Sequence, residues 1–132
     1  MKNKVENKKA LIICLLVIYV FVILSETLLF RKPFEGEHLQ LELFWSYKVI
    51  DVQFKQMLGN VLMFIPFGLL LSLLDKRVWL VLLSGFFFSC LVEILQFVLK
   101  VGLCEWDDVL HNTLGTLIGL LIGKWIISKA YE

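Results

Sequence analysis

The residues best able to do chemistry in this sequence are carboxylates and amides that interrupt long apolar stretches. They are Asn60, Glu93, Gln96, Asp107, Asp108 and Asn112. Side-chain amides can hold a polar ligand by hydrogen bonds. A buried pair of carboxylates can act as acid and base when burial raises the pKa of one member, and Glu93 and Asp108 are the candidates for such a pair.

Carboxylate and amide oxygens are also the ligands that Mg²⁺ and Ca²⁺ prefer. The candidates for a metal site are Asp107, Asp108 and Asn112, with Glu105 as a further donor. The sequence therefore offers three kinds of chemistry: binding of a polar group, acid–base catalysis and metal binding. It contains no nucleophile motif, zinc motif or phosphate-binding glycine loop, and we expect no cofactor.

The spacing of these residues places them on shared helix faces. Glu93 and Gln96 are three residues apart, and Asp108 and Asn112 are four apart, so the members of each pair lie on one face of a helix. The second face continues through three glycines, Gly115, Gly119 and Gly123. Because small residues let helices approach closely in lipid, we predict that this stripe faces another helix and carries Asp108 and Asn112 inward.

The composition excludes a soluble enzyme and a disordered chain. Of 132 residues, 59% are hydrophobic and 19% are charged, whereas soluble domains are about 45–50% apolar. A formal net charge of +1 gives no field for a polyanion, so we expect no nucleic-acid partner. Three cysteines without metal-ligand spacing indicate neither a disulfide framework nor a zinc site.

The apolar residues fall into four runs, each close to the length that an α-helix needs to cross a bilayer. The runs cover residues 10–30, 57–74, 78–99 and 108–127. We therefore predict an all-α, polytopic membrane protein with a bundle of four transmembrane helices in a single domain, 1–132. The first run is too long for the hydrophobic region of a signal peptide and lacks a small-residue cleavage site, so we expect it to be retained.

The distribution of lysine and arginine predicts the orientation of the bundle. Eight of them flank one end of the helices and five flank the other. We predict a cell-membrane protein with both termini in the cytoplasm, and with the loops 31–56 and 100–107 outside. The candidate polar residues then gather at the outward-facing end of the bundle.

Several of these residues also have a purely structural interpretation. Asp107 or Asp108 could cap the fourth helix, and Asn60 and Gln96 could hydrogen-bond between helices. A functional role is favoured for Glu93, since its helix contains no Lys or Arg to pair with it.

Two other features allow two interpretations each, and a third predicts a local distortion of a helix. The aromatic cluster Phe44, Trp45 and Tyr47 fits an interfacial segment better than a substrate-facing lip. His111 could titrate near neutral pH, although an interfacial position is the simpler explanation. Pro66, followed by Gly68, predicts a kink in the second helix.

Three segments together resemble the VanZ-like family of small membrane proteins, named for a teicoplanin-resistance protein. They are NVLMFIPFG at 60–68, EILQ at 93–96 and GLCEWDDVLHNTLG at 102–115, and the resemblance extends over about 10–127. Many relatives carry an arginine just before the acidic segment, where this sequence has Val101. Lys100 would then have to replace that arginine without its bidentate geometry.

The resemblance implies a role in the envelope of Gram-positive bacteria and lowered susceptibility to lipoglycopeptide antibiotics such as teicoplanin. Its implied partners are membrane lipids, and a lipid-linked wall precursor or the lipoglycopeptide itself. We favour a binding protein whose outward polar site holds such a ligand. The alternative is a membrane enzyme or transporter for a lipid-linked substrate, with Glu93 and Asp108 as acid and base or as metal ligands.

Overall fold

The computed structural model describes residues 2–33, 35–75 and 77–130. It confirms the all-α prediction, because four helical segments are long and apolar enough to cross a membrane. The first of these segments joins α1 to a π-helical turn, η1. The long helices are α1 (Lys2–Leu24), α3 (Ile50–Leu74), α4 (Val78–Leu99) and α5 (Trp106–Lys129), and η1 (Ser25–Leu29) directly follows α1.

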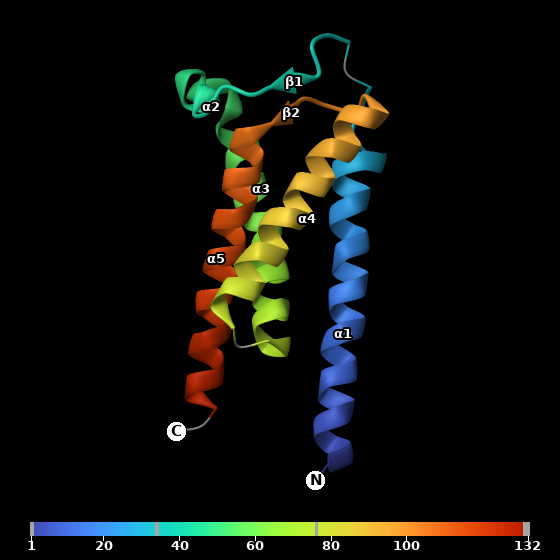
Figure 1. The fold of residues 1–132 in the computed structure, drawn as a ribbon, viewed down its shortest axis with the longest axis vertical. Helices are drawn as coiled ribbons and strands as arrows, with labels where there is room; N and C mark the ends of the chain where they lie inside the picture. The colour runs from blue at the N-terminus through green and yellow to red at the C-terminus, as the bar shows by residue number, and fades with distance from the viewer. Residues whose placement is uncertain (1, 34, 76, 131–132) are drawn as a thin grey trace.

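The start of α1 and the end of α5 lie at the same end of the bundle, as Figure 1 shows. The opposite end carries three short elements: β1 (Leu39–Gln40), α2 (Trp45–Lys48) and β2 (Cys104–Glu105). This arrangement agrees with two predicted outer loops at one end of the molecule. The predicted orientation was based on counts of lysine and arginine. Among these residues, Lys76 lies outside the described residues, as do the side chains of Lys2 and Lys4.

The two outer loops pair with each other through a short parallel sheet. Leu39 lies opposite Cys104, and Gln40 lies opposite Glu105. The Cys104 backbone N–H also donates to the His38 carbonyl at 2.9 Å. The loop between the first and second spans is therefore fixed to the loop between the third and fourth.

The first outer loop is shorter than the predicted 31–56, because α3 already begins at Ile50. Its first two turns alternate polar with apolar residues, so they lack the continuous hydrophobicity that marks a span. The helix continues there because its backbone bonds are internal to it, while exposed residues such as Val52 face solvent or headgroups. α5 likewise begins at Trp106, two residues before the predicted run.

The glycine stripe of α5 faces another helix, as predicted, and that helix is α3. A Cβ atom on Gly115 would overlap the carbonyl oxygen of Val61, and one on Gly119 would overlap that of Ile65. A Cβ on Gly123 would overlap the Ser72 hydroxyl. The backbones of α3 and α5 are therefore in direct contact, and this contact sets the position of every side chain on the stripe.

α3 runs through Pro66 as one continuous helix, and the kink remains a prediction. The buried hydrophobic core lies around the same level, where Phe67 stacks on Phe88 with ring centroids 5.0 Å apart. Ile23 and Val92 complete this core from α1 and α4. The core therefore holds α1, α3 and α4 together, while glycines join α5 to α3.

We predict that Gly119→Ala lowers the thermal stability of the protein in detergent, whereas Gly59→Ala does not. The added methyl at 119 meets α3 backbone that cannot move aside, and overpacking costs about 1–3 kcal/mol. At Gly59, on α3 itself, no atom lies within 4 Å of an added Cβ, and alanine is the better helix former. Equal melting temperatures for the two variants would contradict the backbone-contact packing.

Candidate polar site at the outer end

Three carboxylates from two helices and a loop are buried together at the outer end of the bundle. The backbone N–H of Glu105 donates to Glu93 Oε2 at 3.0 Å, which joins β2 to α4. Gln56 Nε2 donates to Asp108 Oδ2 at 3.0 Å and lies 3.5 Å from Glu105 Oε1. We call Glu93, Glu105 and Asp108 the acidic cluster. Gln56 is its main neutral donor from α3.

Asp107 faces away from this cluster and caps α2. Its carboxylate accepts hydrogen bonds from the Phe44 N–H at 2.6 Å and from the Ser46 N–H at 2.9 Å, and also from the Ser46 hydroxyl. The alternative that Asp107 or Asp108 caps its own helix is wrong, because the described start of α5 has no side-chain cap. Asp107 instead satisfies donors of the first outer loop, where Phe44 adopts a left-handed conformation with φ of 62°.

The aromatic cluster takes part in the same network. Trp45 Nε1 donates to Glu105 Oε2 at 2.7 Å, and the Tyr47 hydroxyl lies 3.0 Å from His111 Nε2. Phe44 and Tyr47 are also exposed, as expected for an interfacial segment. The segment therefore covers the polar site, and its position at the membrane interface stays a prediction.

Two of the predicted amides join helices to one another. Gln96 Nε2 donates to the Thr27 carbonyl at 3.2 Å, so α4 is held against the π-helical turn η1. Asn112 Nδ2 donates to the Ser89 hydroxyl at 2.8 Å, between α5 and α4. Both side chains are at least 98% buried. The structural interpretation predicted for Gln96 is confirmed, and Asn112 acts in the same way.

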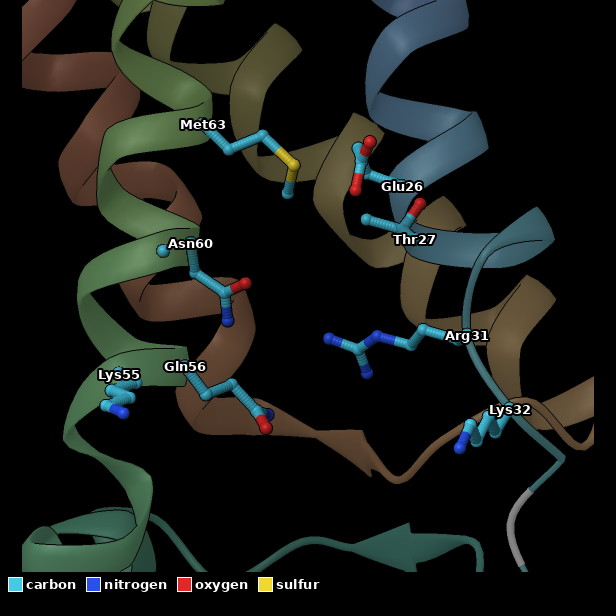
Figure 2. A pocket seen from close by; sticks show the side chains of 9 residues that line it. Glu26, Thr27, Arg31, Lys32, Lys55, Gln56, Asn60 and Met63 are labelled. Carbon is cyan, nitrogen blue, oxygen red and sulfur yellow. The ribbon is translucent and has the colours of Figure 1, made fainter.

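A cavity of about 550 Å³ lies between η1 and α3, beside the acidic cluster (Figure 2). Asn60 and Gln56 line it from successive turns of α3, and Arg31 reaches toward them from the segment after η1. Asn60 faces the Asp108 carboxylate, yet its Nδ2 makes no hydrogen bond of regular geometry with any described residue. Gln56 and Asn60 thus separate the cavity from the buried acids.

Arg31 and Gln56 are the two important residues that the sequence did not single out. Gln56 precedes Asn60 by four residues and so shares its helix face, which was a usable signal. Arg31 lies in a loop and gave none. Its side chain packs on Gly102, where an added Cβ would be 2.8 Å from Arg31 Nη1, and it interacts electrostatically with Glu93 and Asp108.

Lys100 does not provide the cation expected beside the acidic segment. It is exposed, with φ of 56°, at the left-handed turn that ends α4. The guanidinium near the buried acids comes instead from the first outer loop. Arg31 can take the place of Lys100 because the two outer loops pair with each other, and the sequence alone did not predict this pairing.

The structure brings together Asn60, Glu93 and Asp108 but disperses the candidate metal ligands. Asp107 bonds to α2, while Asn112 bonds to Ser89 on α4. Within residues 2–33, 35–75 and 77–130, no group of three or more His, Cys, Asp or Glu side chains is arranged to hold a metal ion.

A second, smaller cavity of about 180 Å³ borders the acidic cluster. Its walls are mostly apolar, from Leu41, Ile94, Trp106 and Val109, and it also touches Glu93 and Glu105. The acidic cluster therefore borders the apolar cavity directly, and reaches the polar cavity through Gln56.

Glu105 is the member of the cluster that lies outside the membrane spans, and its pKa is raised from an ordinary 4.5 to about 7. Burial is the main cause, and the negative charge of Asp108 adds to it. The hydrogen bond from Trp45 acts in the opposite direction and lowers the pKa. Glu105 therefore changes charge near neutral pH.

Four apolar helices with a buried polar site at one end define a multi-pass membrane protein. The chain belongs to the VanZ/LLP1 family, whose model matches residues 10–127. It is 39% identical over 69 residues to Protein VanZ of Enterococcus faecium. That similarity covers 51% of this chain and 43% of the relative. The aligned part therefore spans less than half of that protein. No solved structure matches the chain.

We predict that the wild-type protein loses thermal stability between pH 5 and 8 and that Glu105→Gln reduces this loss. Because the folded-state pKa is raised, the stabilising contribution of this group is fully present below about pH 4.5 and is lost as the pH rises through about 7. The glutamine stays neutral and still accepts the bond from Trp45. Melting temperatures in detergent across this pH range measure the effect.

Glu37→Gln is the matched control, since Glu37 is an exposed glutamate in the first outer loop, which pairs with the loop that contains Glu105. It should leave the pH dependence unchanged. Parallel pH profiles for wild type and Glu105→Gln would contradict the assignment of this transition to Glu105.

Proposed function

We propose that this protein lowers the susceptibility of a Gram-positive bacterium to lipoglycopeptide antibiotics such as teicoplanin by binding an envelope lipid or lipid-linked ligand. The binding site is the polar cavity at the outer end of the bundle. Family membership supports the antibiotic class, and the geometry of the cavity supports binding. Both are expectations for this chain, since its similarity covers less than half of the Enterococcus relative.

The observation that carries the proposal is the position of Gln56 and Asn60. Both side chains line the cavity, and both face the Asp108 carboxylate behind it. Buried polar groups are costly in a membrane protein unless they have partners, and they mark ligand sites by default. A ligand in this cavity would therefore contact groups whose orientation is already fixed by the acidic cluster.

The predicted orientation supports a ligand of this kind. The positive-inside rule puts the end of the bundle that carries β1, α2 and β2 on the outside, and both termini in the cytoplasm. Lipid-linked wall precursors and lipoglycopeptides meet at the outer leaflet. A cell-membrane location with this topology is part of the proposal.

The second candidate function is an enzyme or transporter for a lipid-linked substrate. The observation in its favour is that Glu93 and Glu105 touch the apolar cavity while Gln56, which contacts Glu105 and Asp108, lines the polar one. Glu93 and Asp108 would act as acid and base in the enzyme, or would line the substrate pathway in the transporter. Cys104 is a poor nucleophile here, because burial raises its pKa to about 11.

We predict that Glu93→Gln, Asp108→Asn and Asn60→Ala each lower teicoplanin resistance at least severalfold. Two of the variants each remove a carboxylate from the acidic cluster, and the third removes the Asn60 amide beside it. In each case the new side chain is no larger than the one it replaces. The measurement is the minimal inhibitory concentration in a susceptible Gram-positive host, with membrane levels checked by blotting. Glu37→Gln serves as the exposed control and should retain full resistance.

The pattern of loss separates the two candidate functions. Loss in all three variants, Asn60→Ala included, supports ligand binding. Loss confined to the two carboxylate variants, together with inhibition by a divalent-metal chelator, supports the enzyme. Full resistance in all three at normal membrane levels would reject both.

The topology can be tested separately. A reporter inserted in the 75–77 turn should behave as cytoplasmic, and the same reporter inserted after residue 36 should behave as extracellular. The reverse result would place the polar cavity on the cytoplasmic side and would reject the proposed contact with outer-leaflet ligands.

A further inference from the structure

The cavity between η1 and α3 presents more cationic groups than anionic ones. Arg31, Lys32 and Lys55 line it, with Glu26 as its one acidic lining residue in the described part of the chain. The ion pairs between described residues lie elsewhere, at Lys48–Glu42 and Arg77–Asp75. The three cations that line the cavity therefore have no ion-pair partner among the described residues.

Of the three cations, Arg31 needs the largest number of hydrogen-bond acceptors. A guanidinium carries five N–H donors in a planar fork, and Arg31 donates none of them in a hydrogen bond to a described residue, although its side chain is half-buried. In Figure 2 it points across the cavity toward Gln56 and Asn60. The buried acids behind these two amides attract it over a longer range. A ligand that supplies several acceptor oxygens would satisfy this fork.

The depth of the cavity indicates the kind of anion. The first span ends at Leu29, two residues before Arg31. Arg31 and Lys32 therefore lie immediately beyond the hydrocarbon region, at the level of the lipid headgroups. The anionic group of a phospholipid or lipid-linked precursor at this level is a phosphate, and a guanidinium binds phosphate in bidentate fashion.

We propose that this cavity binds the phosphate group of its ligand, with Arg31 as the main contact and Lys32 and Lys55 at the rim. This proposal rests on the proposed function and names the chemistry that the polar site recognises. Gln56 and Asn60, on the wall opposite Arg31, contribute neutral polar groups and no negative charge there. Gly102 lies against the Arg31 side chain with φ of 105°, a conformation that favours glycine, and the absence of a Cβ there leaves room for the guanidinium.

The test measures phosphate binding directly on the full chain in detergent. Purified protein is titrated with phosphatidylglycerol, with diacylglycerol of the same acyl chains, and separately with inorganic phosphate. Native mass spectrometry counts the bound lipids, and thermal stability reports phosphate binding. We expect phosphatidylglycerol to bind with a first site that diacylglycerol lacks, and Arg31→Gln to weaken that site about tenfold or more, as expected for the loss of a charge-assisted hydrogen bond.

Arg77→Gln is the matched control, because Arg77 lies at the other end of the bundle in an exposed pair with Asp75. It should leave the first site unchanged. Arg31→Lys should give an intermediate affinity, since it keeps the charge and loses the fork. The double variant Lys32→Gln/Lys55→Gln changes only exposed side chains, and it should weaken the site severalfold even if Arg31→Gln does not fold.

Stabilisation by inorganic phosphate alone would assign the site to a free anion, and retention of phosphatidylglycerol alone would assign it to a lipid headgroup. Wild-type affinity in the folded Arg31 and lysine variants would overturn the proposal, as would an equal loss in Arg77→Gln. The resistance assay keeps the two proposals separate. Lost phosphate binding with full resistance rejects the proposed function, whereas lost resistance with intact phosphate binding in Arg31→Gln rejects the phosphate site.

Discussion

The outer end of this protein depends on the need to give every buried carboxylate its donors. An unpaired charge in or near a bilayer is costly. Here the donors come mainly from neutral groups: the Glu105 N–H for Glu93, Gln56 for Asp108, and α2 for Asp107. Because these donors belong to the outer loops and the first turns of α3, satisfying the carboxylates also fixes the loops. The polar site and the cover above it therefore form as one structure.

The buried carboxylates find their donors only because the glycines of α5 bring it close to α3. Gly115 and Gly119 let the backbone of α5 contact that of α3, and the same face carries Asp108 and Asn112 at the top of the contact. A larger separation would move Asp108 out of reach of Gln56. The small residues in the apolar part of the helix thus determine the geometry of the polar part.

Most of the fold could be predicted from the sequence, because its signals are local. Apolar runs gave the four spans, and the spacing of Asp108, Asn112 and the glycines gave the buried face of α5. The direction of Asp107 could not be predicted, since a carboxylate in the first helical turn can cap its own helix or a neighbour. Arg31 was missed for a related reason: only the parallel pairing of β1 with β2 brings its loop beside Gly102.

The unequal burial of the helices affects the polar cavity. α1 is the least buried of the four spans and α5 is the most buried, so the cavity has one wall on the most weakly held helix and the other on the rigid α3–α5 pair. A bond from the Tyr19 hydroxyl to the Met63 carbonyl, 2.8 Å long, joins the two walls below the cavity. The bond from Gln96 to the Thr27 carbonyl holds the same wall against α4 at the level of the cavity. Two hydrogen bonds to backbone carbonyls, rather than the burial of α1, therefore set the distance between Arg31 and the amides on the opposite wall.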